Sequence, residues 1–248
     1  MSPWIHRLLL WHRMVGLAVA AILIVLAITG VLLNHSADLK LHQRWITHPV
    51  ILDWYQIPDD FNPPVSFQVG ENWVSQIDDH IYFNEMFLFS SDATLVGALT
   101  YEDGWLYVLN NQLHLYNAAV QLIEHIDLTS EFSESIDRIG INSEKQLILR
   151  VAQTNWIADP ELIGWQPYIA TDIGWARPGL FPNQIRSRLF QLHRQRQLSF
   201  EHFILQLHNA QIFGSIGKWL LDLLALSVVL LATSGPYIWW RAIRKNRS

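Results

Sequence analysis

Histidines are the residues of this chain best suited to chemistry, because the sequence has 11 of them and no cysteine. The lack of cysteine excludes disulfides, thiolate catalysis and cysteine-ligated metals. Four histidines, His12, His35, His42 and His208, lie beside long apolar segments. Imidazoles placed there are suited to ligating the iron of a haem group, or, as the simpler alternative, to hydrogen-bonding with lipid headgroups and backbone.

The spacing predicts that these four histidines lie at the two edges of a membrane. On an ideal helix, His12 and His35 are about 34 Å apart. His42 shares the face of His35 if the helix continues, and His208 precedes the second apolar segment on the same outer side. We therefore expect His35, His42 and His208 to converge. Two imidazoles from different helices are a standard axial pair for haem b, and no other metal site is expected.

Two apolar segments near the chain ends must position these histidines. Residues 15–33 contain no charged residue, and Asp222 is the one charged residue among residues 219–240. The first segment covers about 28 Å as a helix, enough to cross a hydrocarbon core. No small-x-small cleavage site follows it, so we favour an uncleaved anchor over a signal peptide.

Basic residues predict the orientation of the two spans. Arg7 and Arg13 precede the first span, and the second is followed by Arg241, Arg244, Lys245 and Arg247. Both termini are therefore expected in the cytoplasm. The acidic segment between the spans is expected outside it, which in a bacterium means an inner-membrane protein with a periplasmic domain.

The segment between the spans has the pattern of an antiparallel β meander. Between residues 95 and 126, short apolar runs alternate with turn pairs such as Asp103-Gly104. Four strands in so short a stretch is the format of a propeller blade, and residues 77–88 and 139–151 read as weaker copies. The segment is too short for a closed propeller at about 40 residues per blade. We expect an open or two-layered sheet, or one completed by a partner.

Three histidines of this β segment, His80, His114 and His125, alternate with apolar residues. A strand-surface role is the expectation for each.

These patterns divide the chain into four parts. They are an N-terminal transmembrane helix with an outer helical extension (1–45), an extracytoplasmic β-rich domain (46–182), amphipathic juxtamembrane helices (183–212), and a C-terminal transmembrane helix with a basic cytoplasmic tail (213–248). The predicted fold class is a membrane protein in which two transmembrane α-helices flank a mainly antiparallel, blade-like β domain.

Several function classes have no support in the sequence. It contains no Gly-rich phosphate loop, no His-Glu-x-x-His and no nucleophile elbow, so no catalytic residue is predicted. The basic residues are explained by topology, and nucleic-acid binding is not expected.

The two ends of the chain resemble the PepSY-associated transmembrane family. The N-terminal end has His12-Arg13-Met14-Val15-Gly16-Leu17, a long apolar run and then Thr29-Gly30. The C-terminal end has Leu207-His208, Gly214, Gly217-Lys218, an apolar span, Ser234-Gly235 and Trp239-Trp240-Arg241. Together these motifs cover about a quarter of the chain.

The resemblance links the chain to redox proteins among the larger members of the family and, for short members, to accessory subunits or assembly partners of larger membrane complexes. Larger members of the family include iron-uptake reductases that pass electrons across the membrane through haem b to ferric siderophores. The resemblance suggests His12 and His208 as the family-matched histidines. This chain has two spans where the reductases have four or more, and its central part shows no clear α+β PepSY pattern.

Two functions remain open from the sequence. The first is a non-enzymatic accessory or assembly subunit whose helices and β domain bind a larger membrane complex. Small residues at Gly30 and Gly235 allow close approach of a partner protein or a second copy in the bilayer. The second is a haem b electron carrier or ferric-siderophore reductase component, with His12 at the inner edge and His208, with His35 or His42, at the outer edge.

Overall fold

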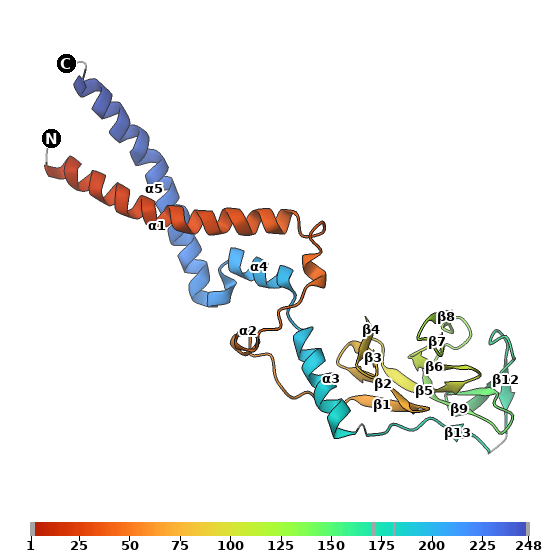
Figure 1. The fold of residues 1–248 in the computed structure, drawn as a ribbon. Helices are drawn as coiled ribbons and strands as arrows, with labels where there is room; N and C mark the ends of the chain where they lie inside the picture. Colours follow the sequence, from red (N-terminus) through yellow and green to blue (C-terminus); the bar gives the residue numbers. More distant parts are fainter. Residues whose placement is uncertain (1–2, 170–171, 181, 247–248) are drawn as a thin grey trace. The chain divides into compact units, whose positions relative to one another are not determined.

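The computed structural model of the chain describes residues 3–169, 172–180 and 182–246. The chain divides into two compact units. The first joins Met1–Gln56 to Gln195–Ser248 and holds the two long helices. The second, Ile57–Arg194, holds the β-sheets (Figure 1).

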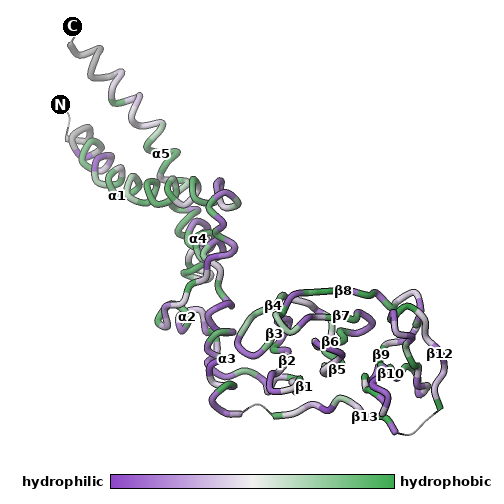
Figure 2. Tube along the Cα trace, turned by 45° about the vertical axis from the view of Figure 1, so that its right-hand side comes forward, coloured by the Kyte–Doolittle hydropathy of each residue, from purple (hydrophilic) through white to green (hydrophobic). Residues whose placement is uncertain are grey.

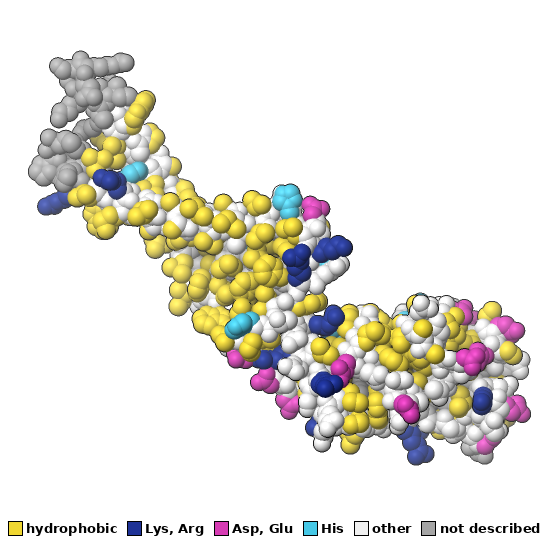
Figure 3. Space-filling view, in the orientation of Figure 1, with side chains coloured by type: hydrophobic (Ala, Val, Ile, Leu, Met, Phe, Trp, Pro, Cys, Tyr) yellow, Lys and Arg dark blue, Asp and Glu magenta, His cyan; other side chains and the backbone are white. Residues whose placement is uncertain are grey.

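The two long helices are α1 (Pro3–Asn34) and α5 (Ser215–Asn246). Their apolar parts, Leu9–Asn34 and Ser215–Trp240, have 26 residues each and are long enough to cross a membrane. Only 11% of the most apolar window of either helix is buried within the chain, whereas a core helix of a soluble protein is mostly buried. Hydrophobic residues follow α1 for most of its length (Figure 2), and hydrophobic side chains dominate the face of the helices seen in Figure 3.

Shorter elements complete the helical unit. They are η1 (Leu41–Gln43), α2 (Pro49–Trp54), α4 (Phe200–His208) and η2 (Gln211–Phe213). The expected continuation of the first helix to residue 45 is not formed. The helix ends at Asn34, residues 35–40 form turns, and Lys40 has a left-handed backbone conformation with φ of 51°. A residue in that conformation cannot continue a right-handed helix.

Three antiparallel sheets make up the β unit. The first has the order β1-β2-β3-β4, with bounds Val65–Val69, Asn72–Ile77, His80–Phe83 and Met86–Ser90. The second has the order β5-β6-β7-β8, with bounds Leu95–Tyr101, Gly104–Leu109, Gln112–Asn117 and Leu122–Asp127. The third has the order β12-β11-β10-β9-β13, where β9 to β13 are Ile136–Ile141, Leu147–Val151, Thr154–Ala158, Trp165–Tyr168 and Gly174–Trp175.

The middle sheet is buried on both faces. One face of β6 places Trp105 and Tyr107 in a core shared with the first sheet, and the other face places Leu106 and Val108 in a core shared with the third. The three successive meanders match the blade-like pattern expected from the sequence. The predicted fold class, two apolar helices flanking antiparallel β-sheets, is confirmed.

A late segment joins the first and third sheets of the β unit. β13 pairs with β9, and the Ala176 N–H donates to the carbonyl of Ile139 at 2.9 Å. The Gly179 N–H then donates to the carbonyl of Ser66 in β1 at 2.8 Å. The segment therefore ties the edge of the third sheet to the edge of the first.

The two helices predicted as a juxtamembrane pair fall in different units. Helix α3 (Asn183–Gln195) packs Leu189 and Phe190 against Ile77 and Tyr82 of the first sheet. Residues 183–194 thus belong to the β unit and α4 to the helical unit, which differs from the predicted boundary at 182. The amphipathic pattern of α3 reflects burial against a sheet.

Candidate functional site

The helical unit holds His12 against the far end of the other long helix. The His12 Nδ1 lies 2.9 Å from the Ser234 Oγ. That hydroxyl is within 3.4 Å of the Leu231 carbonyl, to which it donates its proton. A Cβ at Gly235 would lie 3.6 Å from the His12 Cε1, an ordinary van der Waals distance, so the imidazole packs against α5 at this glycine.

His208 has the same surroundings at the end of α4. Its Nδ1 lies 2.9 Å from the Thr29 Oγ1, which donates its own proton to the Val25 carbonyl at 2.8 Å. A Cβ at Gly30 would lie 3.5 Å from the His208 Cε1. Each histidine is therefore matched to a hydroxyl residue followed by glycine on a different helix.

These hydrogen bonds determine which ring nitrogen carries the proton. Because each hydroxyl donates to a backbone carbonyl, its oxygen accepts the proton of the histidine Nδ1. The hydrogen-bond network thus assigns the Nδ1–H tautomer to His12 and His208 and leaves the Nε2 lone pair available. No described residue makes a hydrogen bond to either Nε2. Metal-ligating histidines are held in this way, with the non-ligating nitrogen donating to a fixed acceptor.

The two histidines share one side of α1. His12 and Gly30 are five helical turns apart, so they lie on the same line along the helix about 27 Å from each other. His208 packs against α1 at Gly30. One imidazole therefore lies near each end of the apolar span Leu9–Asn34.

A groove runs between α1 and α5. Its first part is a cavity of about 600 Å³ whose lining includes Trp11, His12 and Ser234. Its second part, about 590 Å³, is apolar and includes Leu207, the residue before His208, whereas His208 itself is not among its lining residues. Val15 and Ser227 line both parts, so the two are continuous. Cavities of about 300–1,000 Å³ are usual for small-molecule and cofactor sites.

The other two predicted ligands lie elsewhere in this unit. His35 follows the last residue of α1, and its Nδ1 contacts the Asp38 carboxylate at 3.3 Å with more than half of the side chain exposed. His42 is exposed on η1. No group of three or more His, Asp or Glu side chains in the described part of the chain is arranged to hold a metal ion. His35, His42 and His208 therefore do not form a shared metal-binding group among the described residues.

The small residues expected to face a partner contact histidines of the same chain. Gly30 lies against His208 and Gly235 against His12. Within this chain, the group that lies close to each glycine is an imidazole.

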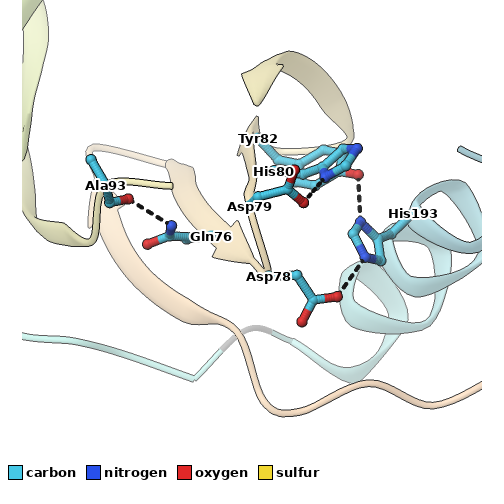
Figure 4. Close-up of polar contacts among 7 residues, drawn as sticks. All are labelled: Gln76, Asp78, Asp79, His80, Tyr82, Ala93 and His193. Atoms are coloured by element: carbon cyan, nitrogen blue, oxygen red, sulfur yellow. Dashed lines mark hydrogen bonds and ion pairs between the residues drawn. The ribbon is translucent and has the colours of Figure 1, made fainter. Parts of the chain in front are cut away.

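The β unit contains a polar cluster that sequence reasoning missed. His193 of α3 is fully buried, and its ring lies between the Tyr82 hydroxyl, 2.9 Å from Nδ1, and the Asp78 carboxylate, 3.1 Å from Nε2 (Figure 4). His80 lies edge-on to this ring, 4.9 Å between centroids, and contacts Asp79. Burial lowers the pKa of His193, and the hydrogen bond that its ring donates to the Asp78 carboxylate opposes the shift. The cluster anchors α3 on the sheet.

His114 is buried, which corrects the strand-surface role expected for it. Its side chain is 8% exposed, stacked 4.8 Å from the Tyr107 ring and 4.5 Å from the His125 ring. Burial, with a smaller contribution from His125, lowers the pKa of His114 to about 4. The alternation of polar and apolar residues correctly placed His114 in a strand, but both faces of the middle sheet are covered by other sheets.

A comparison with known protein families finds a match over nearly the whole chain. The family model described as the PepSY-associated TM region matches residues 3–242. No curated protein matches the chain. The crystal structure of HIRA(644-1017) is similar at 9% sequence identity and a TM-score of 0.30. The match covers 41% of this chain and 38% of that one, and a likeness so low carries no argument about fold or function.

Proposed function

Because the chain belongs to the family of PepSY-associated transmembrane proteins, we propose that it is a membrane-embedded haem b electron carrier, a component of the ferric reductase type. His12 and His208 are its proposed axial ligands. The observation that carries the proposal is the repeated hydrogen bond from histidine Nδ1 to a hydroxyl, which leaves both Nε2 lone pairs available.

The residues present fit such a group. Imidazole Nε2 is an ordinary axial ligand of haem iron, and the surrounding side chains are apolar. The two imidazoles pack against the neighbouring helices at Gly235 and Gly30. When bound, haem supplies one-electron transfer. The chain's own contribution is to fix the ring orientation of each ligand and to exclude water with the side chains of two apolar helices.

The proposal includes an orientation in the membrane. With the basic ends of the chain in the cytoplasm, His12 lies near the inner edge and His208 near the outer edge. The β unit is then extracytoplasmic, which in a bacterium is the periplasmic side of the inner membrane. Two redox groups at different depths are an arrangement suited to moving electrons across the bilayer.

A visible spectrum of the purified chain tests the proposal. Protein expressed with ample haem supply and solubilised in mild detergent is expected to show a Soret band that shifts on reduction. His12→Ala and His208→Ala are each expected to remove part of the band. His202→Ala is the matched control, since His202 lies on the same short helix as His208 but is exposed. A wild-type chain without a Soret band refutes the proposal, as does an equal loss in all three variants.

An exposed strand favours a second candidate function, an accessory or assembly subunit. β8 is an edge strand of the middle sheet, and its Leu122 and Ile123 are 52% and 58% exposed. Exposed edges with apolar side chains are sites where a strand of another chain is added. Native membranes solubilised gently would then yield the chain in a larger complex, which Ile123→Lys should disrupt and Ile163→Lys, in an exposed turn, should not. Recovery of the free chain alone would exclude this role.

A further inference from the structure

We infer that a second copy of this chain supplies the second axial ligand at both histidines, so that each haem is held between two chains. The inference rests on the proposed function and names the partner that it requires. Its basis is a count of ligands. Each end of the helix pair offers one imidazole with an open Nε2, whereas paired histidine ligation of a haem needs two.

Among the side chains that the structure describes, the linings of the two cavities contain no second ligand. The cavity beside His12 is lined by apolar, aromatic and hydroxyl side chains, without another histidine or a methionine. The second cavity is lined by apolar side chains and Ser227. His35 and His42 are exposed beyond the end of α1. With no second ligand in these described linings, we assign the second ligand at each position to another chain.

One partner surface is able to serve both positions. The two cavities share Val15 and Ser227 and so form one groove. His12 and the Gly30 position that holds His208 lie on one line of α1, about 27 Å apart. A partner lying along this groove needs an imidazole near each end, at the same two depths in the membrane.

A copy of the chain meets this requirement by symmetry. A two-fold axis along the membrane normal keeps the depth of every residue, so His12 meets His12 of the copy and His208 meets His208 of the copy. The helices have the exposed apolar side chains that such packing in a bilayer uses. Any other partner would need two histidines placed independently at matching depths.

Mixed pairs of chains test the inference. Wild-type chain with one affinity tag and His208→Ala with another are co-expressed, and pairs are purified through both tags. Low-spin haem is counted by electron paramagnetic resonance, and native mass spectrometry gives the number of chains and haems.

Sharing predicts two haems in the wild-type pair, both low-spin. In the mixed pair one of these two sites loses a ligand, so half of the low-spin signal is lost and a high-spin signal replaces it. A pair of wild-type chain with His202→Ala should keep the full low-spin signal.

Two results overturn the inference and leave the proposed function standing. One is a haem-loaded single chain. The other is a mixed pair that keeps three-quarters of the low-spin signal, as four unshared sites would. A wild-type chain that binds no haem removes the proposed function itself, and this inference with it.

Discussion

The hydroxyl of Thr29 should control haem affinity at the outer position. Thr29 is 4% exposed, and its Oγ1 accepts the proton of the His208 Nδ1 at 2.9 Å. Thr29→Val keeps a β-branched side chain of similar size and removes that acceptor. The His208 ring then loses the contact that fixes its tautomer and orientation. Removing such an outer contact costs about 10–100-fold in metal affinity, or about 1.4–2.7 kcal/mol.

The chain contains a matched control for this variant. Thr233 makes the same intrahelical bonds as Thr29: its Oγ1 donates to the carbonyls of Val229 and Leu230 at 2.9 and 3.1 Å. Its hydroxyl contacts no histidine among the described residues. Thr233→Val therefore reports the effect of losing a helix hydroxyl without the effect on His208.

The assay is a haem titration of the full chain in nanodiscs, followed by Soret absorbance, in the His12→Ala background so that only the outer position is read. Thr29→Val should weaken binding by about 10–100-fold, Thr29→Ser should retain most of the affinity, and Thr233→Val should bind as its parent does. Unchanged affinity in Thr29→Val would refute the tautomer argument. An equal loss in Thr233→Val would attribute the effect to the helix and not to the histidine.

Three further predictions concern the β unit, each measured by urea unfolding of the detergent-solubilised full chain. The pKa of His114 is about 4 in the folded chain and about 6.5 when unfolded, so the unfolded state binds this proton first as the pH falls, and stability should drop by about 3 kcal/mol from pH 7 to 4. His114→Phe should remove that part of the pH dependence, and an unaltered slope would contradict the assignment. His193→Phe should lower the free energy of unfolding by about 2 kcal/mol. Tyr82→Phe should then cost less in the His193→Phe background than in the wild-type chain, whereas equal costs in the two backgrounds would argue against a direct hydrogen bond. Gly104→Ala should cost about 2 kcal/mol, because its Cβ would overlap the Tyr116 carbonyl oxygen; wild-type stability would show that the strands can separate there.

Period and composition were sufficient to predict the spans and the β meander. An uncharged apolar run such as residues 15–33 has few structures open to it other than a membrane helix. Turn pairs such as Asp103-Gly104 mark the ends of short strands whatever lies around them. Both signals are local, so the sequence contains them in full.

The errors arose where the outcome depends on distant contacts. Nothing in residues 34–45 shows that Lys40 takes a left-handed conformation, and the expected continuation of the first helix to residue 45 is therefore not formed. His114 alternates with apolar residues as a surface strand residue does. It is buried because a second sheet covers the face on which it lies, which the pattern of one strand cannot reveal.

The pairing of each histidine with a hydroxyl and a glycine depends both on local sequence motifs and on the arrangement of the two long helices. Each long helix has Ser or Thr before Gly near its end, and a histidine precedes each apolar span. At each end of the chain, the histidine lies before the apolar span and the Ser-Gly or Thr-Gly pair lies near its end. The two therefore cannot meet within one span. Once the two spans are taken as antiparallel, as the basic residues predict, His12 is level with Ser234 and His208 with Thr29. The contact follows from topology combined with two short motifs.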